Sequence, residues 1–266
     1  MDFTFGIITS KNTCGYLDVI IESIVKQHID TYEIIIVGDN NLNVNNYPNI
    51  PIVQLPFNEH MKTSWITKKK NILCQHAKYE NIVLIHDYIK LETGWYEGFK
   101  RYGNNFQFCI NPIQRIDGSR YRDYLFFTPI IEHIIGNEAF IPYNVEIPQP
   151  LNTLLYISGA YYVIKRDIAL KYPLCENLAW GEGEDVVLSK ELTCAGINIQ
   201  CNPYSVAKLL KHKGKIHFEN EMSREKCAHL LGLDATTVTN YNKTQKFHLI
   251  NELKNLCSNH IKLLLE

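Results

Sequence analysis

The sequence has no surplus of charge of either sign, because 27 Lys and Arg residues balance 28 Asp and Glu residues to a formal net charge of −1. Proteins that grip phosphate backbones usually carry a basic surplus, so we expect no nucleic-acid partner. No stretch approaches the roughly 20 consecutive apolar residues that cross a bilayer, so we predict no membrane span. Residues 1–6 lack the basic segment that begins a signal peptide, which favours a cytoplasmic protein.

The eight cysteines include no Cys-x-x-Cys pair. Zinc sites and redox motifs need closely spaced thiolates, so the cysteine pattern argues against both. We expect reduced, mostly buried thiols, as is usual in the cytoplasm.

A chain of 266 residues with 45% hydrophobic residues can fill the core of one large domain. Apolar runs at 3–9 and 32–38 predict strands, and the helical spacing of apolar residues over 14–27 predicts a helix between them. This order forms a βαβ unit, which implies parallel strands. The fold class is therefore α/β, with a mostly parallel central sheet flanked by helices. The same half continues with a strand at 51–55, a helix at 64–78 and a strand at 81–85.

The second half of the chain is less regular. Residues 112–150 show little periodicity and predict long loops with short β pieces, whereas 156–165 predicts a strand. A helix over 184–194 is expected to close at Gly196, because glycine readily adopts the left-handed conformation that ends helices. The remaining predictions are short strands at 197–201 and 205–210 and helical structure from about residue 219.

Open α/β sheets bind ligands beyond the carboxyl ends of their strands. Asp39 and Asp87 each follow a predicted strand at this edge, and although Asp is a common turn residue, two of them fit a nucleotide and a cation. Asp39 would accept hydrogen bonds from a ribose or base, and Asp87 would hold a divalent metal facing a diphosphate. The polar residues at the three strand ends are Thr9, Ser10, Asp39, Asn40, His86, Asp87 and Tyr88.

The most specific motif of the chain is Trp180-Gly181-Glu182-Gly183-Glu184-Asp185. It is similar to a Trp-Gly-x-Gly-Glu-Asp element of several sugar transferases. Other matching segments are Thr9-Ser10, the Asp39 turn, the basic Lys68-Lys69-Lys70-Asn71 and Gly94-Trp95-Tyr96. In this combination the chain resembles the GT-A-fold glycosyltransferases, particularly family-2-like members, over residues 3–217.

The resemblance implies a GT-A, Rossmann-like domain over 1–218, with a nucleotide-binding half over 1–100 and an acceptor-binding half over 101–218. A C-terminal helical extension over 219–266 follows it. The implied donor is a nucleotide-diphosphate sugar, with UDP as the expected nucleotide. The residues expected to bind this donor are Thr9, Ser10, Asp39, Asn40, Lys70, Asn71, His86, Asp87 and Tyr88.

By the same resemblance, Asp185 is the general base that removes the proton of the acceptor hydroxyl, and the anomeric carbon is inverted. Glu184 would bind acceptor hydroxyls, and Trp180 would offer a flat face to a sugar. Two acids at a helix start are also favoured by the helix dipole alone, without any catalytic role. The acceptor-binding residues expected are Trp180, Gly181, Gly183, Ser158 and Gly159.

The metal motif departs from the pattern of the resemblance. Instead of Asp-x-Asp, the chain has His86-Asp87-Tyr88, with one carboxylate. Asp87 is the expected ligand of Mn²⁺ or Mg²⁺, which stabilises the departing diphosphate as a Lewis acid. A histidine from a late strand commonly joins such sites, and both His212 and His217 are candidates.

Lys68, Lys69 and Lys70 are interpreted as a solvated helix face, from which one of them, with Asn71, would reach the nucleotide. The segments Tyr121 to Tyr124 and Tyr161-Tyr162 suggest walls of an acceptor groove, although tyrosine is equally common in half-buried strands.

We therefore predict an inverting, metal-dependent glycosyltransferase that acts on a glycan or protein acceptor. Two alternatives stay open: a non-catalytic carbohydrate-binding or scaffold relative of the same fold, and a sugar-phosphate nucleotidyltransferase. The nucleotidyltransferase would need a glycine-rich loop after the first strand, and the chain has no glycine there until Gly15. The C-terminal helices are a candidate surface for a homodimer.

Overall fold

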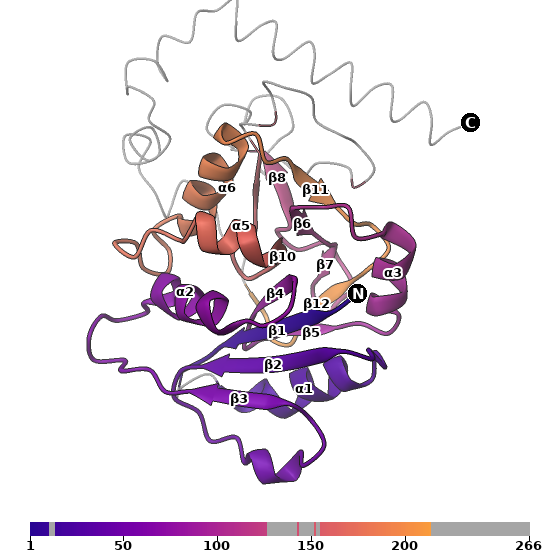
Figure 1. Cartoon of the computed structure of the whole chain (residues 1–266), viewed down its shortest axis with the longest axis vertical. Coiled ribbons are helices and arrows are strands. Elements are labelled where there is room, and N and C mark those ends of the chain that lie inside the picture. Colours follow the sequence, from indigo (N-terminus) through magenta and orange to yellow (C-terminus); the bar gives the residue numbers. More distant parts are fainter. Residues whose placement is uncertain (11–13, 127–142, 144–151, 153–154, 214–266) are drawn as a thin grey trace, which may run out of the picture.

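The computed structural model describes residues 1–10, 14–126, 143, 152 and 155–213. In this part of the chain a seven-stranded sheet has the order β11-β6-β10-β4-β1-β2-β3 (Figure 1). Neighbouring strands are parallel except at β10, which is antiparallel to both β4 and β6. The mostly parallel α/β sheet predicted from the sequence is confirmed. The strands of the sheet are β1 (Phe3–Ile8), β2 (Tyr32–Val37), β3 (Ile52–Leu55), β4 (Asn81–His86), β6 (Phe108–Ile110), β10 (Tyr161–Lys165) and β11 (Ile199–Cys201).

Helices flank this sheet (Figure 1). Helix α2 packs on β1 and β2 and also contacts α5, which directly follows β10. None of the helices in the described ranges combines the length and apolar character needed to cross a bilayer. The helices are α1 (Leu17–Val25), preceded by the 3₁₀ turn η1 (Cys14–Tyr16), α2 (Ile66–His76), α3 (Trp95–Tyr102), α5 (Arg166–Lys171) and α6 (Glu184–Cys194), and η2 (Val44–Asn46) is a further 3₁₀ turn.

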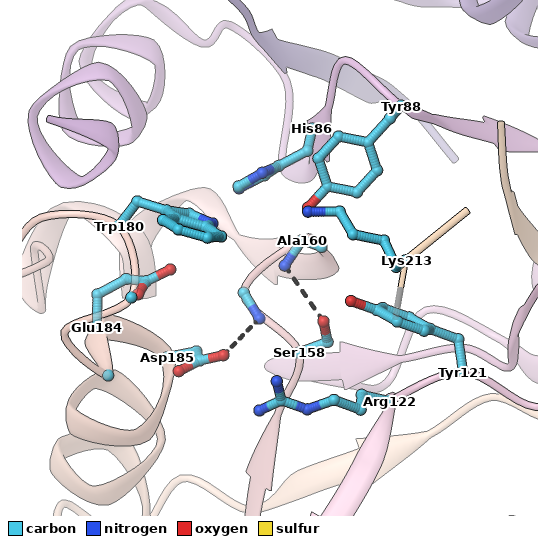
Figure 2. A pocket seen from close by; sticks show the side chains of 13 residues that line it. His86, Tyr88, Tyr121, Arg122, Ser158, Ala160, Trp180, Glu184, Asp185 and Lys213 are labelled. Atoms are coloured by element: carbon cyan, nitrogen blue, oxygen red, sulfur yellow. Dashed lines mark hydrogen bonds between the residues drawn. The ribbon is translucent and has the colours of Figure 1, made fainter. Parts of the chain in front are cut away.

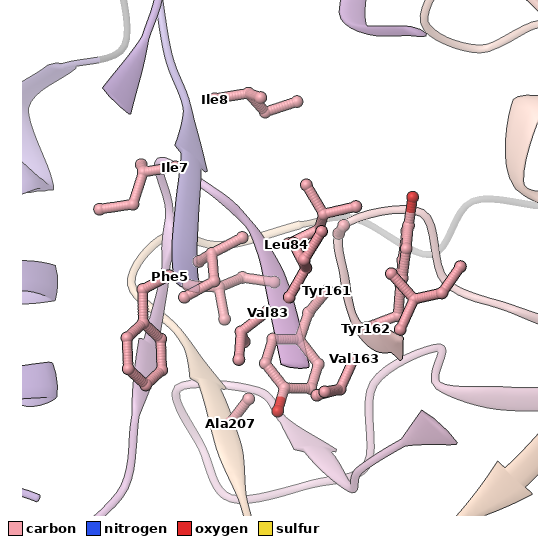
Figure 3. Packing of buried hydrophobic residues seen from close by; sticks show 14 of the residues in the cluster. Phe5, Ile7, Ile8, Val83, Leu84, Tyr161, Tyr162, Val163 and Ala207 are labelled. Carbon is pink, nitrogen blue, oxygen red and sulfur yellow. The ribbon is translucent and has the colours of Figure 1, made fainter. Parts of the chain in front are cut away.

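Strand β1 is buried on both faces, which explains its continuous apolar sequence. Phe3 and Phe5 share one face, and their ring centroids lie 5.3 and 5.6 Å from that of Trp95 in α3. Gly6 faces α2 on the other side, where an added Cβ would lie 2.2 Å from the side chain of Leu73. Figure 3 shows that buried side chains of β4 and β10 belong to the same hydrophobic core as those of β1.

Two small sheets bring late segments of the chain back to the early strands. Strand β12 is antiparallel to β5, with Leu209 opposite Ile89, and parallel to β7. Strand β8 is antiparallel to β9. The segment that follows β12 therefore lies beside the end of β4. These strands are β5 (Ile89–Leu91), β7 (Ile113–Gln114), β8 (Tyr124–Phe126), β9 (Leu155–Ile157) and β12 (Ala207–Leu209).

The single strand predicted over 156–165 is wrong. The chain turns at residues 158–160, so β9 pairs with β8 whereas β10 enters the central sheet. The Ser158 hydroxyl accepts a bond from the Ala160 amide at 3.4 Å, and its carbonyl accepts one from the Tyr161 amide at 3.4 Å. The sequence analysis also missed β5, α3, β6 and α5. Tyr161 and Tyr162, predicted to wall an acceptor groove, are buried in β10 at 0% and 1% exposure and line neither of the cavities described below. The predicted helical extension over 219–266 and His217 lie outside the described residues.

Candidate active site

A cleft of about 600 Å³ opens at the carboxyl ends of β1, β2 and β4. We call it the strand-end cleft. It collects six of the side chains that the sequence placed at this edge, together with Lys69, Lys211, Lys213 and Trp180. Those six are Thr9, Ser10, Asp39, His86, Asp87 and Tyr88.

A second cavity, the α6 pocket, lies at the amino end of α6 and holds the predicted acid pair, Glu184 and Asp185 (Figure 2). All five predicted acceptor-binding residues line it, and so do Tyr121 and Arg122. The two cavities adjoin, because four residues line both of them: His86, Tyr88, Trp180 and Lys213. Asp87 and Asp185 are thereby brought to two neighbouring cavities from segments about 100 residues apart.

Asp87 is fixed by the first strand. The Thr9 hydroxyl donates a hydrogen bond of 2.8 Å to Asp87 Oδ2, and the Asp87 amide donates to the Ile8 carbonyl at 3.2 Å. The parallel register that places Ile8 opposite His86 sets this contact. Because the side chain is 4% exposed, the cleft presents a buried carboxylate at its floor.

Asp185 is held in place by backbone amides. Gly159 donates to Asp185 Oδ2 at 2.9 Å and Val186 donates to Oδ1 at 2.9 Å. Gly159 is required by close approach, since an added Cβ would lie 2.6 Å from Glu184 Oε1. Gly181 and Gly183, at φ 80° and 78°, adopt the left-handed conformation that lets the chain enter α6.

Glu184 is buried beside a buried lysine. Lys70 Nζ donates to the Gly159 carbonyl at 2.8 Å and lies 3.5 Å from Glu184 Oε1. Burial, and secondly the charge of Asp185, raise the pKa of the Glu184 carboxyl to about 7, against the opposing effect of Lys70. The two adjacent acids therefore occupy different electrostatic environments.

Comparison with known proteins gives no matching family model and no matching curated protein. Solved structures do match. A crystal structure of GalNAc-T7 with UDP, GalNAc and Mn²⁺ aligns with a TM-score of 0.63 and 14% identity over 97% of this chain. S. aureus TarS 1–349 in complex with UDP-GlcNAc aligns with a TM-score of 0.55 and 14% identity over 86% of it. Both are glycosyltransferases of the GT-A type. The chain has the GT-A fold.

The chain spans only part of these GT-A structures, 55% of the GalNAc-T7 chain and 64% of TarS 1–349. The fold expected from the Trp180–Asp185 motif is confirmed at this low identity. The positions of individual site residues rest on the geometry described above.

The solvated helix face predicted for the three lysines is wrong for two of them. Lys69 and Lys70 are 3% and 1% exposed. Lys69 lines the strand-end cleft, donates to the Thr9 carbonyl at 2.7 Å and pairs with Glu59. Lys68 alone stays half-exposed, in an ion pair with Glu176. Helix α2 packs on β1 and β2, and the side of the helix that carries Lys69 and Lys70 is therefore buried.

Three residues predicted to bind the nucleotide line neither cavity: Lys70, Asn71 and Asn40. The Asn71 side-chain amide donates to the Leu174 carbonyl and accepts from the Leu174 amide, at 2.9 Å each. Asn40 closes its own turn through the Gly38 carbonyl and the Leu42 amide. These side chains brace loops around the site instead.

His86 carries a buried nitrogen, Nε2, that has no hydrogen-bond partner in the structure as described. The residue itself lines both cavities. Burial, followed by the charges of Lys70, Lys213, Lys211 and Lys69, holds the pKa of the imidazole well below its ordinary value. His86 is therefore neutral near pH 7.

The metal site predicted at Asp87 and His212 or His217 is only partly assembled. His212 is exposed and lines neither cavity, and His217 is outside the described ranges. Among the residues with described positions, no three His, Cys, Asp or Glu side chains gather closely enough to hold a metal ion. Asp87 alone does not make a resident Mn²⁺ or Mg²⁺ site.

Three cationic side chains of the cavities were not predicted from the sequence: Arg122, Lys211 and Lys213. Arg122 lies within the Tyr121–Tyr124 segment, which was interpreted from its tyrosines alone. Lys211 and Lys213 flank His212, a predicted metal ligand. They reach the cleft because the Leu210 amide bonds to the Tyr88 carbonyl, a tertiary contact that the local sequence pattern does not reveal.

Proposed function

We propose that the protein is an inverting glycosyltransferase that moves a sugar from a nucleoside-diphosphate donor, a UDP-sugar, to a hydroxyl of a glycan or protein acceptor. The observation that carries this proposal is the junction of the two cavities. One presents Asp87 at the carboxyl ends of the sheet and the other presents Asp185 at the start of α6. A donor bound in the first cavity and an acceptor bound in the second would meet at this junction. The GT-A fold, shared with structures that contain UDP or UDP-GlcNAc, supports it.

In this proposal the nucleotide occupies the strand-end cleft. Asp39, exposed at the end of β2, accepts hydrogen bonds from the ribose or base. The diphosphate lies near Asp87 and Tyr88, and the sugar lies at the junction beside His86 and Trp180. The exposed Trp180 ring, 51% accessible, offers the apolar face that sugars stack on.

The acceptor hydroxyl enters the α6 pocket, where Asp185 takes its proton as attack proceeds. Backbone donors on both carboxylate oxygens fix the orientation of this base. Attack from the α6 side, opposite the departing diphosphate, inverts the anomeric carbon. Lys70 braces the Gly159 turn behind the base, and Glu184, which lines the α6 pocket, binds acceptor hydroxyls.

A divalent cation on the diphosphate was predicted from the sequence and would act as a Lewis acid. The described residues supply one ligand for it, Asp87, so no step of this mechanism depends on the ion.

The test is a comparison of wild type with Asp185→Asn in a transfer assay with UDP-sugars and a panel of glycan and peptide acceptors. We expect UDP release to fall about a hundred-fold or more, because general base catalysis contributes on that order. UDP affinity should be unchanged, and NMR of the wild-type product should show the inverted anomer. Asp167→Asn, an exposed acid in α5, is the matched control. Equal turnover by Asp185→Asn would contradict the proposal. A wild type that binds UDP-sugars and releases no UDP would be the non-catalytic relative.

A further inference from the structure

The segment after the last strand presents two lysines to the cavities. In β12, Ala207 and Leu209 are buried at 0% and 1% exposure, and the chain bends at Leu210 and Lys211 directly after the strand. Lys211 and Lys213 line the strand-end cleft, whereas His212 between them is exposed.

Backbone contacts fix where these lysines lie. The Leu210 amide donates to the Tyr88 carbonyl at 2.8 Å, which ties the segment to the end of β4. Arg115 Nη1 donates to the Lys213 carbonyl at 2.8 Å from the other side. The segment is thus held directly beside the strand end that carries Asp87.

Both ammonium groups lie over one aromatic ring at the mouth of the cleft. Lys211 Nζ and Lys213 Nζ are each 4.3 Å from the ring centroid of Tyr88, and Lys213 Nζ is 5.5 Å from that of Trp180. Both residues line the strand-end cleft, and Lys213 also lines the α6 pocket (Figure 2). Two positive charges therefore lie where the two cavities meet.

The chemistry of the proposed reaction requires positive charge at this junction. When the bond between the anomeric carbon and the phosphate oxygen breaks, its electron pair stays on the diphosphate, whose negative charge grows. Lysine ammonium groups aimed at developing phosphate charge stabilise such a transition state. The GT-A site of this chain offers one carboxylate for a metal but two ammonium groups for the phosphates.

We propose that Lys211 and Lys213 bind the diphosphate of the donor and stabilise it as the leaving group, in the role for which the sequence predicted a divalent metal. This inference rests on the proposed function and identifies the residues of its phosphate subsite. The lysines act through their charge and hydrogen bonds alone: they transfer no proton and form no covalent bond.

The experiment measures UDP and uridine binding by isothermal titration calorimetry in EDTA and in Mn²⁺. The variants are Lys211→Met, Lys213→Met and the double variant, which keep an unbranched side chain one atom shorter and remove its charge. Lys208→Met, in β12 but lining neither cavity, is the matched control. Lys213→Arg tests whether a retained charge retains binding. Thermal unfolding of each variant shows whether it is folded.

We expect wild type and Lys208→Met to bind UDP in EDTA. Each Lys→Met change should weaken UDP about ten-fold or more, the size of a hydrogen bond to a charged group, and leave uridine unaffected. The salt dependence of UDP affinity should fall with each lysine removed. UDP binding that requires Mn²⁺ and is equal in the double variant would overturn the lysine subsite while leaving the glycosyltransferase proposal intact. A wild type that binds no nucleoside diphosphate would overturn both.

Discussion

Glu184 and Asp185 are neighbours in sequence, yet their surroundings differ. Asp185 receives a backbone amide on each oxygen. Glu184 is 7% exposed, and its charge partner, Lys70, lies 3.5 Å away and also serves the Gly159 carbonyl. Desolvation disfavours the charged form of a carboxyl, so the buried acid keeps its proton to a higher pH. This difference suits Asp185 to the proposed role of base. It suits Glu184 to the role of a group that forms hydrogen bonds to the acceptor.

The raised pKa of Glu184 predicts how stability depends on pH. Below its ordinary value of 4.5 the carboxyl is protonated in both the folded and the unfolded state. Between 4.5 and about 7 the folded protein keeps a proton that the unfolded chain releases, so stability falls as pH rises through this window. Glu184→Gln has no titrating carboxyl at this position and therefore lacks this pH-dependent change in stability. Its Tm relative to wild type should therefore increase between pH 5 and pH 8, by ~2–4 °C for each kcal/mol involved.

Thermal unfolding of wild type and Glu184→Gln at a series of pH values measures this directly. Asp30→Asn, an exposed acid far from the α6 pocket in sequence, should leave the pH dependence of wild type unchanged. Parallel curves of Tm against pH for wild type and Glu184→Gln would show that burial does not raise this pKa.

At the scale of elements, the sequence predicted long, strongly patterned segments and missed short ones. Helix α6 begins and ends where expected, because two glycines precede its acid pair and Gly196 follows it. The turn at 158–160 was missed because its neighbours are apolar on both sides, as in one continuous strand. The Lys69 and Lys70 side chains point inward for a tertiary reason, the packing of α2 on β1 and β2. The local sequence pattern of α2 does not reveal this packing.

The turn between β9 and β10 contacts the start of α6 at Gly159, so a substitution of this residue tests the contact between the two elements. In Gly159→Ala the new Cβ would lie 2.6 Å from Glu184 Oε1 and 3.1 Å from Asp185 Cβ. One of the acids must move, and a misplacement near 1 Å costs a catalytic site on the order of a hundred-fold in rate. We expect kcat to fall by about that factor with UDP affinity retained. Steady-state kinetics beside calorimetry with UDP measures both.

The control for this change is Gly15→Ala. An added Cβ at Gly15 meets nothing within 4 Å, so transfer activity should stay near that of wild type. A Gly159→Ala variant with full activity would mean that the turn and α6 are not in the close contact that the structure describes.

At the scale of the molecule, the site is assembled from segments that span most of the described chain. Thr9, Asp39 and Asp87 come from the early strands, Asp185 from α6, and Lys213 from the segment after β12. The central sheet joins its early strands to its late ones where β4 pairs with β10. The predicted halves, 1–100 and 101–218, thus contribute strands to one sheet. Such a site exists only when the whole sheet is folded.

A nucleotide bound in the strand-end cleft should therefore stabilise the fold as a unit. A ligand that binds only the folded state stabilises it by about 2.7 kcal/mol at a hundred times its Kd, which raises Tm by several degrees. We expect UDP to raise the Tm of wild type and UMP to raise it less, because UMP lacks the second phosphate. Asp39→Ala should reduce both shifts, since Asp39 lines the cleft and is the exposed acid proposed to bind the ribose or base. Asp117→Ala, an exposed acid outside both cavities, should respond as wild type does. Differential scanning fluorimetry over a concentration series of UDP, GDP and ADP measures these shifts, and equal shifts for all three would contradict base recognition at Asp39.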